Sequence, residues 1–228
     1  KKSNTKPLQQ GRNIIQDIRH TLRIIFQSKI IAHSLFLLAL SQILILILAT
    51  VAPGYANQIL GISVEEFPLV FVAPAAIGMV VGASILVNFF HRHPRERVIT
   101  AGIFASGLAL LFLPFGSKVA SRDFIQLLNI YLPHVFDITI LHVIALVAFV
   151  LGLANSFVFV PANTTLQEKT TDAIRGKMYG FLNTIVGVLA LLPIILVGGL
   201  SDLIGVGTVI TGIGVSLCLL ALVRLVIK

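Results

Sequence analysis

The run IIAHSLFLLALSQILILILATV, residues 30–51, contains no Lys, Arg, Asp or Glu and is long enough to cross a bilayer as a helix. Each helical residue adds about 1.5 Å, so about 20 apolar residues span a hydrocarbon core of roughly 30 Å. Five further runs of this kind follow along the chain. The predicted spans cover about residues 30–51, 67–90, 98–117, 138–161, 178–201 and 203–224.

The fourth uncharged run continues to residue 167, which is longer than a span requires. A proline removes a backbone donor from a helix. We therefore expect the fourth helix to end near Val160-Pro161, with the remainder as loop.

The composition of the whole chain supports the same fold class. The chain is 57% hydrophobic and only 11% charged, whereas a soluble domain carries about 25% charged residues. Lipid offers backbone groups no partners, so helices are the default spanning structure, and strand-like alternation is absent. The sequence predicts an all-α integral membrane protein, a bundle of six transmembrane helices.

Several functional classes are excluded by what the sequence lacks. The single cysteine, Cys218, excludes an intramolecular disulfide and a Cys-rich metal site. No HExxH, GxSxG or phosphate-binding motif is present, and the histidines are not grouped with acids at ligand spacing. The net charge of +8 is spread between apolar runs, which argues against a nucleic-acid partner. We expect no enzyme activity, cofactor or metal.

The distribution of basic residues predicts the orientation. If the N-terminus is cytoplasmic, 15 of the 17 Lys and Arg residues fall on the cytoplasmic side, and only Lys118 and Arg122 fall outside. This is a strong positive-inside bias. We expect a multi-pass protein of the plasma (inner) membrane with both termini cytoplasmic.

The segment before the first span, residues 1–29, is predicted to be a cytoplasmic linker. Within RNIIQDIRHTLRIIFQSK, apolar residues recur at helical spacing opposite a basic face. Such a basic amphipathic helix suits a headgroup surface. It is either a linker helix leading into the first span or a site for a regulatory partner.

Uncharged polar residues and one histidine inside the spans are candidates for the substrate path. His142 lies about a turn inside the fourth span, where it is either a proton or substrate ligand or an interfacial histidine bonded to a backbone carbonyl. Gln42, Asn155 and Asn183 carry amides that need partners in hydrocarbon. They serve either as links between helices or as substrate contacts.

Small residues at a spacing of four predict close helix packing. Gly78 and Gly82 form a GxxxG pair in the second span, and Gly152 and Ser156 repeat the spacing in the fourth. Small side chains let helix backbones approach closely in membranes.

Three segments resemble the C-terminal six-helix half of the major facilitator superfamily. QDIRHTLRIIFQSKIIAHSL resembles the central segment that leads into the seventh helix, with a D-I-R-x-x-L-R pattern from Asp17 to Arg23. HRHPRERVITAG resembles the basic loop between helices eight and nine. VPANTTLQEKTTDAIRGKMYGFLNT is similar to the loop between helices ten and eleven of drug-efflux, macrolide-efflux and enterobactin-exporter-like members.

The resemblance implies a gate of ion pairs at the cytoplasmic face. A set of charges that breaks and re-forms suits alternating access, while the alternative is a static topology anchor. The loop after residue 90 departs from the family pattern, because it lacks the usual aspartate and second glycine. The gate or cytoplasmic-loop residues would be Arg92, Arg95, Glu168, Asp172, Arg175, Gly176 and Lys177. Gly176 and Gly180 are also expected to let another helix end approach closely.

By this resemblance the chain is expected to be half of a secondary-active transporter that exports small amphipathic molecules by alternating access, with proton antiport as the implied coupling. Family members hold substrate between two six-helix halves, so the expected partners are the lipid bilayer, a small-molecule substrate and a missing N-terminal half. The alternative is a non-transporting membrane scaffold or a subunit of a split transporter.

Overall fold

The computed structural model describes residues 21–63, 65–89, 94–119 and 140–226, and all elements in these ranges are helical. The long helices are α2 (Lys29–Gly54), α3 (Ala73–Phe89), α4 (Arg95–Val119), α6 (Ile140–Lys169), α7 (Asp172–Ile204) and α8 (Val206–Val226). Two π-helical segments, η1 (Tyr55–Leu60) and η2 (Pro68–Val72), extend α2 and precede α3. Six helices in the described part are long and apolar enough to cross a membrane. The predicted six-helix membrane bundle is confirmed.

The ends of α2 show how local sequence defines a span. Ser28 caps its start, where the hydroxyl accepts a hydrogen bond from the Ile31 backbone N–H at 3.4 Å. Pro53 lies near the other end and lacks an N–H, and the helix widens directly afterwards into η1. The chain then turns at Gly61, which has a φ of 65° that glycine adopts readily.

The fourth span does not end at Val160-Pro161, so that prediction was wrong. Helix α6 continues through Pro161 to Lys169, and Thr170 and Thr171 alone separate it from α7. Proline lacks the N–H that would bond the carbonyl of Phe157, four residues earlier, and a membrane helix tolerates this loss. The hydroxyls of Thr164 and Thr165 donate to the carbonyls of Val160 and Pro161 at 2.9 and 2.8 Å.

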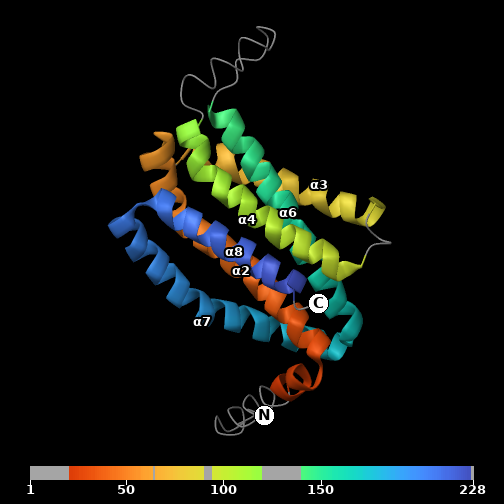
Figure 1. Ribbon diagram of the computed structural model, residues 1–228. Coiled ribbons are helices and arrows are strands. Elements are labelled where there is room, and N and C mark those ends of the chain that lie inside the picture. Colours follow the sequence, from red (N-terminus) through yellow and green to blue (C-terminus); the bar gives the residue numbers. More distant parts are fainter. Residues whose placement is uncertain (1–20, 64, 90–93, 120–139, 227–228) are drawn as a thin grey trace, which may run out of the picture.

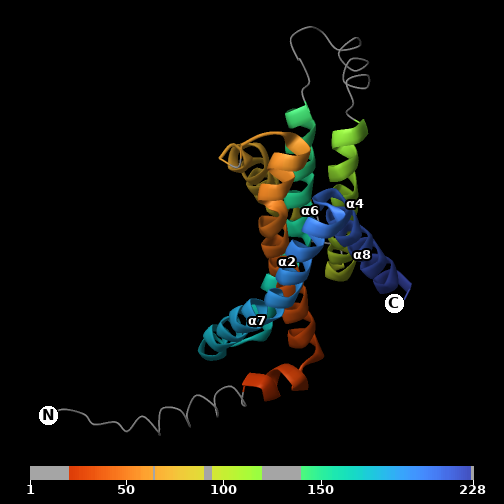
Figure 2. The same cartoon turned by 90° about the vertical axis from the view of Figure 1, so that its left-hand side faces the viewer.

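Helix α6 is the centre of the bundle. It packs against α2, α3 and α4, while α8 lies along α4 and α7 lies along α2 (Figure 1). Seen from the side, α7 runs obliquely past the lower part of α2 (Figure 2). The core between these helices contains Leu38, Leu110 and Leu166, all fully buried. The faces of α3 and α7 that look outward are apolar, as a helix facing lipid requires.

Close approach of α3 to α6 depends on the glycines that the sequence singled out. A Cβ on Gly78 would lie 2.0 Å from the Phe149 carbonyl oxygen, and a Cβ on Gly152 would lie 1.8 Å from the carbonyl oxygen of Ala75. A Cβ on Gly82 would lie 2.1 Å from the Ser156 hydroxyl oxygen. The predicted close-packing face is therefore confirmed.

We predict that Gly78→Ala destabilises the bundle, because the added methyl group meets backbone and must push α3 away from α6. Such overpacking costs about 1–3 kcal/mol. Unfolding in detergent measures the change. The control is Gly187→Ala on α7, where a Cβ would meet nothing within 4 Å and stability should be equal or higher by about 0.5–1 kcal/mol. Equal destabilisation by both variants would contradict the packing argument.

Candidate functional site

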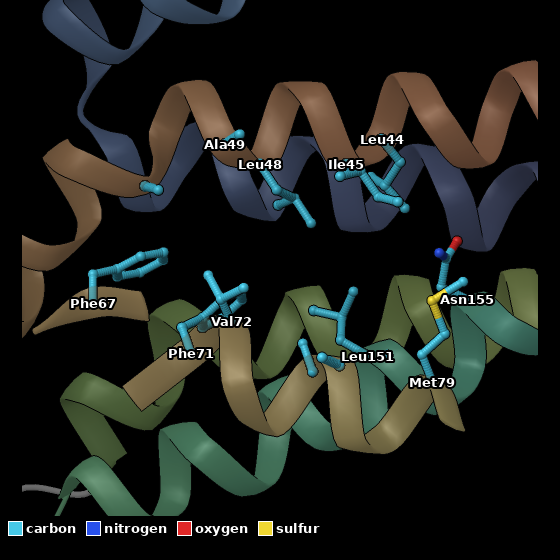
Figure 3. A pocket seen from close by; sticks show the side chains of 14 residues that line it. Leu44, Ile45, Leu48, Ala49, Phe67, Phe71, Val72, Met79, Leu151 and Asn155 are labelled. Carbon is cyan, nitrogen blue, oxygen red and sulfur yellow. The ribbon is translucent and has the colours of Figure 1, made fainter. Parts of the chain in front are cut away.

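An apolar cavity of about 360 Å³ lies between α2, α3 with its preceding segment η2, and α6. We call it the α2–α3 cavity; Leu48 of α2, Phe71 of η2 and Leu151 of α6 are among the side chains that line it (Figure 3). Two other lining residues, Ile45 and Val72, are about half exposed, so the cavity opens to the outside of the bundle. Pockets of this size and apolar character bind small molecules.

Asn155 is the one polar side chain among the fourteen residues that line the α2–α3 cavity. It is only 6% exposed, and its Oδ1 accepts a hydrogen bond of 2.7 Å from the Ser41 hydroxyl of α2. The amide Nδ2 has no hydrogen-bond partner among the described residues, and it lies on the cavity side of the group (Figure 3). An amide donor that faces the cavity without a protein partner among the described residues is available to a ligand that offers an acceptor.

The other polar candidates of the spans do not join Asn155 in the cavity. Gln42 is half-buried on α2, while His142 at the start of α6 and Asn183 on α7 are exposed. None of these three residues lines the α2–α3 cavity. The residue that sequence reasoning missed is Ser41, whose partner lies 114 positions away.

The basic end of the bundle, where α2 and α4 begin and α6 and α8 end, holds two of the predicted gate residues in contact. Arg95 of α4 donates from Nη1 and Nη2 to the two carboxylate oxygens of Glu168 of α6, at 2.7 and 2.8 Å. Arg95 Nη1 also donates to the Thr165 hydroxyl at 3.1 Å. Bidentate pairs of this kind are strong and directional. Arg92 lies outside the described residues.

Arg175 holds the elbow between α6 and α7. Its Nη2 donates to the backbone carbonyls of Gln167 and Thr170, at 3.2 and 3.5 Å, and its Nη1 pairs with Asp172 at 2.9 Å. The Gln167 carbonyl belongs to the last turn of α6, where a cation is favourable, and Thr170 lies in the link to α7. Its buried Nε has no partner among the described residues. Arg175 therefore fixes the angle between two spans.

Gly176 and Lys177 lie exposed in the first turns of α7. A Cβ on Gly176 or Gly180 would meet nothing within 4 Å. The close helix packing expected at these two glycines is therefore not found in the part of the chain that the structure describes. A second polar cluster joins the two helices nearby: the hydroxyl of Tyr179 donates to Asn163 Oδ1 and accepts a hydrogen bond of 3.3 Å from Gln167 Nε2.

The comparison with protein families decides the identity of the bundle. A profile described as Major Facilitator Superfamily matches residues 35–228. The chain belongs to the Major Facilitator Superfamily. Searches of curated proteins and of solved structures gave no match. Members of this superfamily are transporters rather than enzymes, which agrees with the six spans and identifies a multi-pass membrane protein.

A cluster of three ionisable residues at the basic end of this Major Facilitator Superfamily chain was not predicted. Arg224 of α8 donates to Glu96 of α4 at 2.6 Å and lies 3.3 Å from the Nε2 of His33 on α2. His33 and Glu96 are 3.6 Å apart. Arg224 lies 191 positions from His33 and 128 from Glu96, so no local pattern could have united them.

We predict that exchanging the charges of Arg95 and Glu168 preserves their contact. Arg95→Glu and Glu168→Arg should each lower the thermal midpoint, because each places two like charges together. The double variant should recover most of the lost thermal midpoint. The midpoint is measured for each variant as the aggregation temperature in detergent. Arg97→Glu is the control, since Arg97 is exposed on the same helix and should leave the midpoint near the starting value. If the thermal midpoint of the double variant falls by the sum of the two single changes, the two residues do not interact.

Proposed function

We propose that this chain is one six-helix half of a secondary-active transporter that exports small amphipathic molecules by alternating access. The observation that carries the proposal is the α2–α3 cavity, with the amide donor of Asn155 at its inner end. An apolar lining with one placed polar group favours an apolar body that carries a hydrogen-bond acceptor. The family membership supports transport as the activity.

We infer that a second six-helix half, in the same protein or in a partner chain, covers the opening of the cavity. Members of the family hold substrate between two such halves. The α2–α3 cavity opens to the outside of this bundle. A hydrogen bond from the Asn155 amide to a ligand is stronger where water is excluded. These two observations support a site completed by a second bundle.

We propose that the basic end faces the cytoplasm of the cell and that its ion pairs form a gate. The excess of Lys and Arg at the predicted cytoplasmic segments supports this orientation in the inner membrane. The pair Arg95–Glu168 joins α4 to α6 at this end, where it can break as the bundle rocks. Asp172, Arg175, Gly176 and Lys177 at the α6–α7 elbow, with Arg92, complete the proposed gate region.

The accumulation of compounds in cells tests export. Deleting the gene that encodes the chain should raise the cellular level of at least one amphipathic compound from a broad panel, and expression from a plasmid should reverse the change. Unchanged accumulation across the panel would favour the alternative, a membrane scaffold or a non-transporting subunit.

We predict that Ala76→Phe blocks export while leaving the protein folded. Ala76 is exposed and lines the α2–α3 cavity, so an aromatic ring there fills space that substrate would occupy. The matched control is Val80→Phe, one helical turn further along α3, at a 68% exposed position that does not line the cavity. Efflux rate and membrane abundance are measured for both variants. Equal efflux in the two variants would exclude the cavity as the substrate site.

We predict that Arg175→Ala slows transport more than it lowers membrane abundance. The substitution removes the contacts that hold the end of α6 against the start of α7, so the elbow loses its defined angle. Arg175→Lys keeps the positive charge but not the planar set of donors, and it should recover only part of the rate. If transport and abundance fall in equal proportion, Arg175 acts as a topology anchor instead.

A further inference from the structure

Three ionisable side chains from three different helices meet at the basic end of the bundle. Arg224 of α8 lies 2.6 Å from Glu96 of α4 and 3.3 Å from His33 of α2. The side chains of His33 and Glu96 are 42% and 43% exposed, while Arg224 is only 16% exposed. The cluster is thus built around a largely buried cation and is exposed at both His33 and Glu96.

The contact between Arg224 and His33 requires one particular tautomer of the imidazole if Arg224 is the donor. A guanidinium carries five donors and no acceptor. Both contacts of Arg224 use its Nη2, and His33 Nε2 accepts from it in the neutral tautomer that carries the proton on Nδ1.

The cluster joins α2, α4 and α8 at the basic end, whereas η1 contacts α4 and α8 at the other end of α2. Helix α8 packs along α4, whereas α2 packs against α6 and α7. In the described part of the chain, His33, Glu96 and Arg224 form ion pairs only with one another. The other charged groups at this end of α2, α4, α6 and α7 are Lys29, Arg95, Arg97, Glu168, Lys169, Asp172, Arg175 and Lys177.

These surrounding charges do not compensate a proton on His33. Glu168 is held by Arg95, and Asp172 is held by Arg175, so the nearby carboxylates already have partners. Glu96, at 3.6 Å, is the anion placed to receive a protonated imidazole. Histidine is the side chain whose ordinary charge change falls between pH 5 and 8.

We propose that His33, Glu96 and Arg224 form a proton-binding site that ties α2 to α8 when it is empty and loosens that tie when it is occupied. A proton from water adds to Nε2 of His33 and removes the lone pair that accepts from Arg224. The net charge of the three groups rises from zero to +1. The imidazolium then repels Arg224 and competes for Glu96, which must be shared between two cations.

Proton binding is tested by an NMR titration of the reconstituted chain between pH 8 and pH 5, with ¹³C at the histidine Cε1. The His33 resonance is assigned by its loss in His33→Gln. We expect this resonance to titrate in the wild-type chain. Glu96→Gln removes the anion that stabilises the imidazolium, so proton affinity should fall about tenfold, and Arg224→Gln removes the opposing cation, so it should rise about tenfold.

The outcomes of the titration decide the proposal. Opposite shifts of the midpoint in the two variants support the site, since a generally loosened fold would move both in the same direction. A His33 resonance that does not titrate in this range, or one that neither variant moves, would overturn it. Where Glu96→Gln does not fold, Glu96→Asp shortens the carboxylate and should weaken proton binding in the same direction.

The structural consequence is tested with spin labels at Ile30 of α2 and Leu225 of α8, which are 51% and 60% exposed, in a Cys218→Ser background. We expect the distance between the labels to increase at pH 5 by about 1–2 Å, the size of helix shifts at switching interfaces. His33→Gln should keep the pH 8 distance, and His33→Lys should give the pH 5 distance at pH 8. A distance that does not change with pH, or a change that is abolished by His142→Gln instead, would overturn the proposed loosening.

A role of this proton in driving export rests on the proposed function, whereas proton binding does not. If the titration and the distance change occur in a chain for which no compound is exported, the proposed function fails and the site stands. If export occurs and His33 does not bind a proton in this range, the site fails and the proposed function stands.

Discussion

The hydrocarbon core of a bilayer provides no hydrogen-bond partners, and the whole structure follows from this constraint. Each span is a helix, and hydroxyl groups such as those of Thr50 and Ser84 donate to the carbonyl four residues earlier. Polar groups that cannot bond within their own helix are paired across helices. Tyr55 donates to the Leu113 carbonyl at 3.0 Å, and Ser41 donates to Asn155 at 2.7 Å. The amide Nδ2 of Asn155 departs from this pattern, and it lies where the bundle has an open cavity.

The cavity is a result of how closely α3 is drawn to α6. Glycines at positions 78, 82 and 152 bring the two backbones together, while α2 contacts α6 at Asn155 through Ser41. The side chains of α2 and α3 therefore line a space rather than filling it (Figure 3). The close packing of α3 on α6 and the open α2–α3 cavity are therefore related. Small residues form the contact between α3 and α6, and larger side chains line the cavity.

Two ionic clusters at the basic end begin from adjacent residues of α4. Successive residues on a helix point about 100° apart, so Arg95 and Glu96 reach different neighbours. Arg95 contacts α6 through Glu168, whereas Glu96 contacts α8 through Arg224 and approaches α2 through His33. One helix start thus connects with three others. In the proposed mechanism, the first cluster belongs to the gate and the second responds to protons.

The number of spans and the family could be predicted from the sequence, because an apolar run of a given length has one stable form in lipid and the loop motifs are local. Arg95 and Glu168 were singled out as gate residues from such local motifs, although their pairing was not. The extent of α6 beyond Pro161 was missed, because a membrane helix tolerates a proline that would end many other helices. The pairing of Ser41 with Asn155 and the cluster of His33, Glu96 and Arg224 join residues that no local pattern connects. The tertiary structure alone decided these contacts, because helix packing determines which of many isolated polar residues share one place.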